Sequence, residues 1–236
     1  MKVKEQFNKY AKHYPHRSVI QQRGAEIVVD SLPESLGTVI DLGCGSGRLF
    51  KLLQNRSLKF NRFYGVDFAE SMLSLHPKGD NIELLIGDFN QASTFERLQK
   101  LDADTLLSAS ALQWAKDIEF TFNSAAKTAP FGAFFLFSSG TFKTIHNIAG
   151  VHSPIHSYTA LESAFLKSYR ALKIEQFHFE LPFPSTLEML RYIQESGVSG
   201  KLMLPYRALK KVLREYPYNY LEFETALFIG ESYDFN

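Results

Sequence analysis

Short apolar runs alternate with segments whose apolar residues recur at helical spacing along the first 140 residues. The apolar runs predict five strands, which lie at 38–40, 63–67, 81–89 with the following turn, 103–110 and 133–137. Between them, helical spacing predicts helices over 48–55 and 118–128, and another that starts near Phe68. This order is typical of an α/β fold, in which helices cover both faces of a parallel sheet.

Two later segments, 174–181 and 220–230, alternate between apolar and polar residues and predict two more strands. The seven strands together predict a doubly wound sheet. The near-continuous apolar residues of 133–137 suit a strand that is covered on both faces. We therefore expect a single domain over 1–236.

Helical additions precede or interrupt this alternation, at 1–30, 141–160 and 184–217. In the first, Phe7, Ala11 and Tyr14 share one helical face, and Pro15 ends that helix. This helix either packs on the sheet or covers a ligand site, with Tyr14 facing it. In the last addition, Ser185 and Glu188 form a capping box. We expect all of the additions to gather over the carboxyl edge of the sheet as a lid.

A glycine-rich turn, Asp41-Leu42-Gly43-Cys44-Gly45-Ser46-Gly47, joins the first predicted strand to the next helix. Glycines at alternate positions permit positive φ angles and the close approach of a ligand. The free N–H groups of the following helix aim at the same place. The fingerprint of dinucleotide enzymes fails here, because Arg48 or Phe50 occupies its third position. The turn predicts a ligand with a carboxylate or ribose hydroxyls; the alternative is a turn without a ligand.

Acidic residues end the second and third predicted strands, at Asp67 and Asp88. Ligands of open α/β sheets bind beyond the carboxyl ends of the strands, where an acid can accept both ribose hydroxyls. Asp67 is our candidate for that role. Phe68 and Met72 either flank a planar ring or pack in the core. Asp88, with Phe89 beside it, either accepts an amino group of that ring or caps a helix.

Gln113 and Trp114 follow the fourth predicted strand and are expected at the same edge, although Trp114 has packing as an alternative role. A pair of histidines, His152 and His156, has a spacing that suggests metal binding. Pro154 between them argues against a regular helix, and no carboxylate accompanies them. We therefore predict no metal site.

Composition and charge narrow the class of protein. The formal net charge is +1 and hydrophobic residues make up 45% of the chain, which predicts a globular core and no general attraction to nucleic acid. Cys44 is the only cysteine, so an internal disulfide is excluded and a reducing, cytoplasmic location is expected. The polar N-terminus and the shortness of the apolar run 131–137 predict no membrane association.

The pattern D-x-G-x-G-x-G at 41–47 resembles motif I of class I S-adenosylmethionine-dependent methyltransferases. Over nearly the whole chain, the sequence is similar to the malonyl-acyl-carrier-protein O-methyltransferases of biotin synthesis. The similar segments are, in order, Phe7-x3-Ala11-x2-Tyr14, motif I, Ala111-Leu112-Gln113-Trp114, the helix around His146, Leu190-Arg191-x3-Glu195-Ser196-Gly197 and Tyr218-x-Tyr220. The resemblance implies a mostly parallel sheet whose last strand is antiparallel.

The same resemblance implies a reaction, a cofactor and a partner. S-adenosylmethionine would methylate the free carboxylate of a malonyl thioester on acyl carrier protein, and we expect a monomer. The cofactor-binding residues that it implies are Asp41, Gly43, Cys44, Gly45, Gly47, Asp67, Phe68, Met72, Asp88, Phe89 and Ser108. Tyr14, Gln113 and Trp114 would shape the methyl-transfer chamber.

The substrate-binding candidates come from the helical additions. His146 and Arg191 are candidates to hold the malonyl carboxylate, because an Arg fork matches a carboxylate; the alternatives are a satisfied core histidine and a surface arginine. A basic stripe on one helix face consists of Arg207, Lys210, Lys211 and Arg214. It would bind the acidic carrier protein, or it is simply a solvated helix face.

Two other functions share the cofactor motifs. One is a methyltransferase for a different small molecule, with a carboxylate or quinone-like acceptor. The other is a non-catalytic protein that binds the cofactor as part of a complex. Methylation of nucleic acid is disfavoured, because the chain has neither an Asn/Asp-Pro-Pro-Tyr motif nor a strong basic excess.

Overall fold

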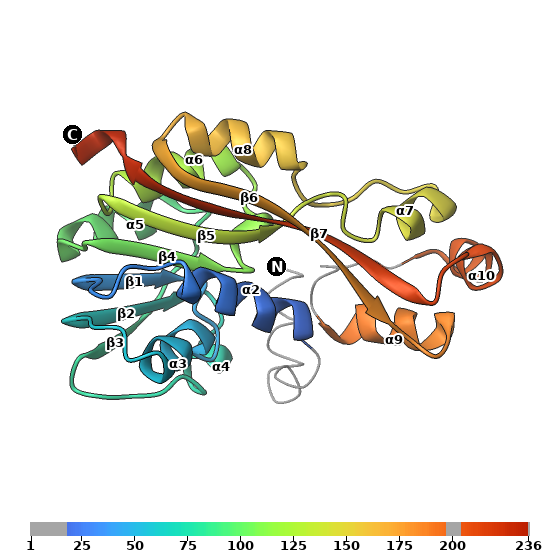
Figure 1. The fold of residues 1–236 in the computed structure, drawn as a ribbon, viewed down its shortest axis with the longest axis horizontal. Coiled ribbons are helices and arrows are strands. Elements are labelled where there is room, and N and C mark those ends of the chain that lie inside the picture. The colour runs from blue at the N-terminus through green and yellow to red at the C-terminus, as the bar shows by residue number, and fades with distance from the viewer. Residues whose placement is uncertain (1–17, 197–203, 236) are drawn as a thin grey trace.

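The computed structural model describes residues 18–196 and 204–235, in which a seven-stranded sheet forms the centre (Figure 1). The strands are β1 (Thr38–Leu42), β2 (Arg62–Asp67), β3 (Ile82–Ile86), β4 (Thr105–Ala109), β5 (Phe131–Phe137), β6 (Tyr169–Pro182) and β7 (Tyr220–Ser232). Their order is β3-β2-β1-β4-β5-β7-β6. The first five pair in parallel, whereas β7 is antiparallel to both β5 and β6. The predicted doubly wound, mostly parallel sheet with an antiparallel last strand is confirmed.

Helices cover both faces of this sheet, as Figure 1 shows. One face carries α2 (Val19–Asp30) and α3 (Arg48–Asn55), and the other carries α5 (Ala92–Leu98), α6 (Ile118–Ala126) and α8 (Tyr158–Leu166). The short helix α4 (Glu70–Leu73) lies against β2 and β3. The α3 helix has the predicted bounds, because its apolar residues recur at helical spacing and all of them are buried.

Strand β5 is buried on both faces, as its continuous apolar sequence predicts. Phe134 packs with the helices of one layer, and Ala133 and Phe135 pack with those of the other. Helix α2 lies very close to this strand, since a Cβ added at Gly24 would come within 2.3 Å of the Phe135 ring. Both apolar layers therefore meet at β5.

Strand β6 begins earlier than the alternating pattern predicts. Helix α8 ends at Leu166, and Tyr169 is already the first residue of the strand. A register shift between Ala171 and Lys173 interrupts the period of two, which hides the first part of the strand in the sequence. The Tyr169 ring is buried and stacks on Phe165 with centroids 4.9 Å apart, which fixes this end of the strand.

Three helices lie beyond the carboxyl ends of the parallel strands, at the right of Figure 1. They are α7 (Lys143–Ala149), α9 (Thr186–Ser196) and α10 (Tyr206–Glu215). With the adjoining ends of β6 and β7 they form a separate core that includes Ile145, Met189, Ile193, Val212 and Phe223. Ser185 accepts the N–H of Glu188 at 3.3 Å, as the predicted cap of α9 requires. Closure of these helices as a lid stays a prediction.

The first predicted helix, which includes Tyr14, lies outside the described residues. In the part of the chain that is described, no helix combines the length and the apolar character needed to cross a bilayer.

Candidate active site

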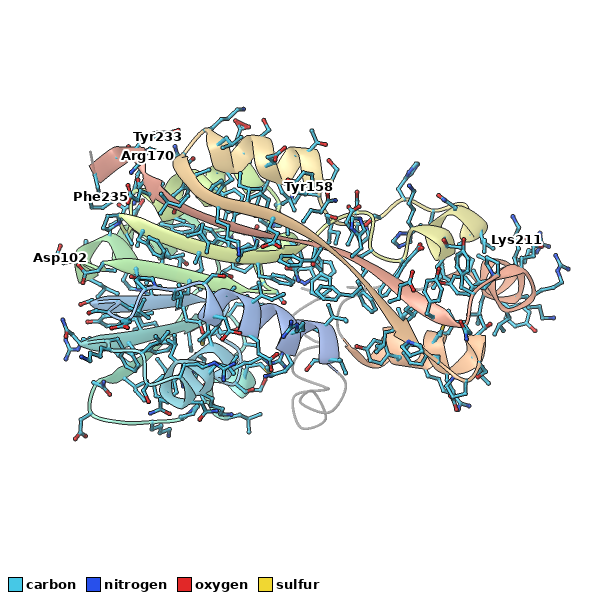
Figure 2. All side chains as sticks on the ribbon, in the orientation of Figure 1. Asp102, Tyr158, Arg170, Lys211, Tyr233 and Phe235 are labelled. Carbon is cyan, nitrogen blue, oxygen red and sulfur yellow. The ribbon has the colours of Figure 1, made fainter. Side chains whose placement is uncertain are left out.

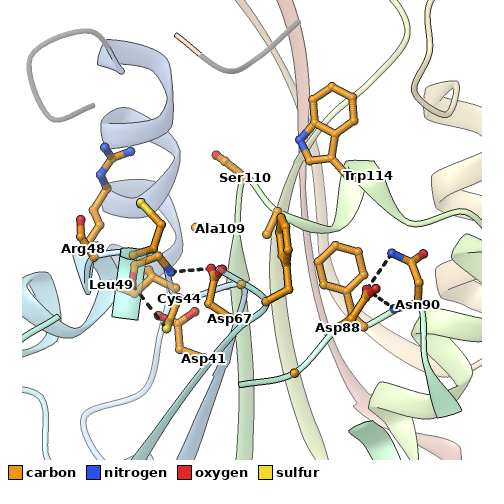
Figure 3. Close-up of a pocket in the computed structure, with 18 of the residues that line it drawn as sticks. Asp41, Cys44, Arg48, Leu49, Asp67, Asp88, Asn90, Ala109, Ser110 and Trp114 are labelled. Atoms are coloured by element: carbon orange, nitrogen blue, oxygen red, sulfur yellow. Dashed lines mark hydrogen bonds between the residues drawn. The ribbon is translucent and has the colours of Figure 1, made fainter. Parts of the chain in front are cut away.

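A cavity of about 340 Å³ opens at the carboxyl ends of β1 to β4 (Figure 3). Its walls come from segments 41–49, 67–72, 87–90 and 109–116, each of which follows or ends one of these strands. This is the place where open α/β sheets bind ligands, and its volume suits a small organic molecule. The four strand ends predicted to carry the site therefore meet in one cavity.

The glycine turn forms one wall of the cavity because its backbone is tightly constrained. Gly43 has φ of +81°, and a Cβ at this position would come within 2.2 Å of the Ala111 Cβ. A side chain there would strain the backbone and clash with the next segment. Gly45 has φ of +55° and lines the cavity, and a Cβ there would meet only the flexible end of Met72, with Cε at 3.3 Å. A ligand can therefore lie against the backbone at Gly45.

The carboxylate of Asp41 is the most unusual group in this cavity. Both Oδ atoms are buried, and neither has a hydrogen-bond partner among the described residues. Burial raises the pKa of Asp41 well above its ordinary value, and the nearby carboxylate of Asp67 raises it further. Buried carboxylates without partners are costly, so this arrangement indicates a place for a cationic group or hydrogen-bond donors of a ligand.

Asp67 is held by the backbone of both the turn and its own strand end. Its Oδ2 accepts the N–H of Gly45 at 3.0 Å, and its Oδ1 accepts the N–H of Ala69 at 2.8 Å. Burial raises the pKa of Asp67, although these hydrogen bonds act in the opposite direction. Each oxygen has a second lone pair for a ligand hydroxyl. The buried thiol of Cys44 beside the two acids also has its pKa raised, mainly by burial, so it stays protonated.

The end of β3 is organised around Asp88 and Asn90 (Figure 3). Asp88 Oδ1 accepts hydrogen bonds from the backbone N–H of Asn90 at 2.9 Å and from its Nδ2 at 3.0 Å. Asn90 Oδ1 in turn accepts the N–H of Lys116 at 2.8 Å, which joins this wall to the segment after β4. Asp88 is not the N-cap of α5, which is Gln91, and Phe89 is buried beside it.

The segment after β4 divides into residues that line the cavity and residues that support it. Trp114 and Ser110 line it, and Ser110 has φ of +61°. The Gln113 side chain is buried and donates from Nε2 to the Ser110 carbonyl at 2.8 Å, outside the lining. Ser108 also lies behind the wall, where its hydroxyl donates to the Leu42 carbonyl at 2.6 Å.

Most of the predicted cofactor residues are brought together, and a few are not. Those that line the cavity are Asp41, Gly43, Cys44, Gly45, Asp67, Phe68, Met72, Asp88 and Phe89. Gly47 begins α3 with φ of +82° and packs against His76 and Pro77 instead. Residues that the sequence did not single out also line the cavity, namely Arg48, Asn90, Ser110 and Lys116. Their only signal in the sequence is nearness to a strand end.

The predicted substrate residues lie on the helices beyond the sheet. His146 on α7 is buried and lines a second cavity, whereas Arg191 on α9 is exposed and lines neither. The basic stripe of α10 is exposed along its whole length. Figure 2 shows one member, Lys211, at the outer tip of the molecule. Lys210 lies over the Tyr206 ring, 4.7 Å from its centroid.

The sequence is similar to that of known methyltransferases. Residues 40–137 match a family model described as "Methyltransferase domain". A malonyl-[acyl-carrier protein] O-methyltransferase of Prosthecochloris aestuarii is 26% identical over 215 residues, which cover 84% of this chain and 77% of the relative. Further relatives with the same name are 23–27% identical.

Solved structures agree on the fold. A Haloferax volcanii complex between the Trm112 methyltransferase activator and a methyltransferase contains a chain with a TM-score of 0.62 and 18% identity, over 96% of this chain and 97% of that one. A geranyl diphosphate methyltransferase in complex with S-adenosylmethionine has a TM-score of 0.51 and 12% identity, and the match covers 89% of this chain and 85% of that one.

Proposed function

Since the chain is a class I methyltransferase that uses S-adenosylmethionine, we propose that it methylates the free carboxylate of a malonyl thioester on acyl carrier protein. The observation that supports this acceptor is the shared name of relatives that align with 84–85% of the chain. That alignment is longer than the matched methyltransferase domain at 40–137, so it includes much of the sequence outside the cofactor motifs. A place in biotin synthesis, a cytoplasmic location and a monomeric state stay predictions.

The residues of the cavity fit this cofactor. It carries a positive sulfonium and an ammonium group, and the cavity offers two buried carboxylates, of which Asp41 has no partner in the described part of the chain. We assign Asp41 and the Gly43–Gly45 backbone to the methionine part and Asp67 to the ribose hydroxyls. Asp88 and Phe89 would bind the adenine.

The cofactor supplies a methyl group on a positively charged sulfur that leaves readily. The malonyl carboxylate is already ionised at neutral pH, because such acids have a pKa of about 4. No general base is needed, and the protein has to align the carboxylate with the methyl group and exclude water. Trp114 and the αL residue Ser110 line the cavity, and we assign to them the role of shaping this chamber. The side chain of Gln113 would support it from behind.

The cavity wall also contains two basic residues, which are our candidates to balance an anionic acceptor. Arg48 and Lys116 line the cavity along with its acidic residues and could balance the incoming carboxylate. The basic stripe of α10 is our proposed contact for the acidic carrier protein, at a distance from the cavity. His146 and Arg191 lie between these regions in the chain but do not line the cofactor cavity.

The test is incubation of the purified protein with cofactor labelled in its methyl group and a panel of acyl thioesters. Transfer of label to malonyl thioesters, with mass spectrometry locating the methyl group on the free carboxylate, is expected. Succinyl and acetyl thioesters are the controls, since the first has a longer acid and the second has none. Transfer to none of the malonyl substrates, with cofactor bound, would contradict the proposal.

A further inference from the structure

A second cavity, of about 370 Å³, lies beside α7 and is separate from the cofactor cavity. Its walls come from segments 139–147 and 151–157. The lining contains Lys143, two histidines, three serines and an asparagine, but no Asp or Glu. Such a wall is rich in hydrogen-bond donors and has a positive charge, which suits an anionic ligand.

Buried polar atoms at this cavity lack partners. His146 is only 6% exposed, and its Nδ1 is buried without a hydrogen-bond partner among the described residues. The Ser153 hydroxyl is also buried without a hydrogen-bond partner among the described residues. Glu222, whose carboxylate accepts the N–H of Thr144, does not line the cavity. Because buried polar groups are nearly always satisfied, two such groups in the lining favour a polar ligand at this place.

One hydrogen bond joins the chain segments that flank the two cavities. His156 Nε2 donates to the carbonyl oxygen of Ala115 at 2.7 Å. Ala115 stands between Trp114 and Lys116, which both line the cofactor cavity. His156 stands between two residues, 155 and 157, that line the second cavity. A ligand in the second cavity can therefore belong to the same substrate molecule as the group that reacts in the first.

We propose that the second cavity binds the phosphate of a 4′-phosphopantetheine arm, and this rests on the proposed function. The arm joins the malonyl thioester to a phosphate ester, so one end requires the methyl-transfer chamber and the other an anion site. Lys143 would supply the charge and His146 a hydrogen bond. His146 thus acts on the arm of the substrate and not on the malonyl carboxylate.

The experiment compares two substrates that differ only in the phosphate, malonyl-pantetheine and malonyl-4′-phosphopantetheine. We expect a KM about tenfold lower for the phosphorylated substrate in the wild-type protein, because charged hydrogen bonds to phosphate are strong. Lys143→Ala and His146→Gln should remove this difference by raising the KM of the phosphorylated substrate to that of malonyl-pantetheine. Lys127→Ala, an exposed lysine outside both cavities, should keep it. Malonyl-coenzyme A and malonyl-carrier protein, run in parallel, show which natural source of the arm the site prefers.

Equal KM values for the two substrates in the wild type, or a difference that survives in Lys143→Ala, would overturn the site. If no thioester is methylated, the proposed function fails, and calorimetric titration with 4′-phosphopantetheine still decides on the site. Binding that is lost in Lys143→Ala and kept in Lys127→Ala supports it, and absence of binding to the wild type refutes it. Circular dichroism of each variant separates loss of binding from loss of fold.

Discussion

Replacing Asp41 with Asn should weaken cofactor binding and at the same time stabilise the cofactor-free protein. Both Oδ atoms of Asp41 are buried without partners in the described structure, and the carboxylate lies close to that of Asp67. Asn has nearly the same size but no charge, so the substitution removes the buried charge without leaving a cavity. Function and stability therefore make opposite demands on this position.

The expected magnitudes follow from the burial of the group. A buried ion without a partner costs several kcal/mol, and a buried amide without a partner costs about 1–3 kcal/mol. We expect the free energy of unfolding of the Asp41→Asn protein to rise by about 1–2 kcal/mol, or roughly 2–8 °C in Tm for a chain of this size. Loss of a hydrogen bond to a charged group, about 1.5–3 kcal/mol, should weaken cofactor binding by about 10–150-fold.

The pH dependence gives a second, independent check. The pKa of Asp41 is raised in the folded protein, so the unfolded chain loses this proton first, above pH ~4. The stability of the cofactor-free wild type should therefore fall as pH rises from there through the folded pKa, and Asp41→Asn should lack this part of the decline. Cofactor affinity of the wild type should increase over the same interval, because the ionised carboxylate binds the cation.

The assays are isothermal titration calorimetry with S-adenosylmethionine and thermal unfolding of the cofactor-free protein. Asp104→Asn is the matched control, since that carboxylate is exposed and accepts the Thr38 N–H at 2.7 Å at the opposite end of the sheet. The control should bind the cofactor as tightly as the wild type. An Asp41→Asn protein that melts below the wild type, or that binds the cofactor equally well, would refute this reasoning.

Three further variants test other parts of the structure. Asp67→Asn should weaken cofactor binding about tenfold and lower the free energy of unfolding by about 1 kcal/mol, because an amide can replace only one of two accepting oxygens. Calorimetry measures the change in binding, and urea unfolding measures the change in stability. Gly24→Ala should cost about 1–3 kcal/mol in urea unfolding and leave cofactor affinity unchanged, because its Cβ would lie 2.3 Å from the Phe135 ring; a change in affinity alone would contradict this. Lys210→Glu with Lys211→Glu should raise KM for a carrier-bound thioester about tenfold by charge repulsion but leave a small thioester unaffected in steady-state assays; equal losses on both would remove the proposed docking role.

The sequence by itself determined the sheet and the position of its ligand edge. Apolar runs and helical spacing are local patterns, so the bounds of α3 and the existence of all seven strands could be predicted. The carboxyl ends of parallel strands must lie at one edge, which is why Asp41, Asp67 and Asp88 could be assigned to one site before any coordinates. The beginning of β6 could not be predicted, because a register shift breaks the alternating pattern there.

Only the tertiary structure decided which side chains face the cavity. Gln113 and Trp114 are adjacent in the sequence, yet Trp114 lines the cavity and Gln113 is turned to the Ser110 carbonyl behind it. The direction of a side chain in a short irregular segment depends on contacts with distant strands, which no local pattern encodes. For the same reason the hydrogen bond between His156 and Ala115, which are 41 residues apart and flank the two cavities, exists only once the chain has folded.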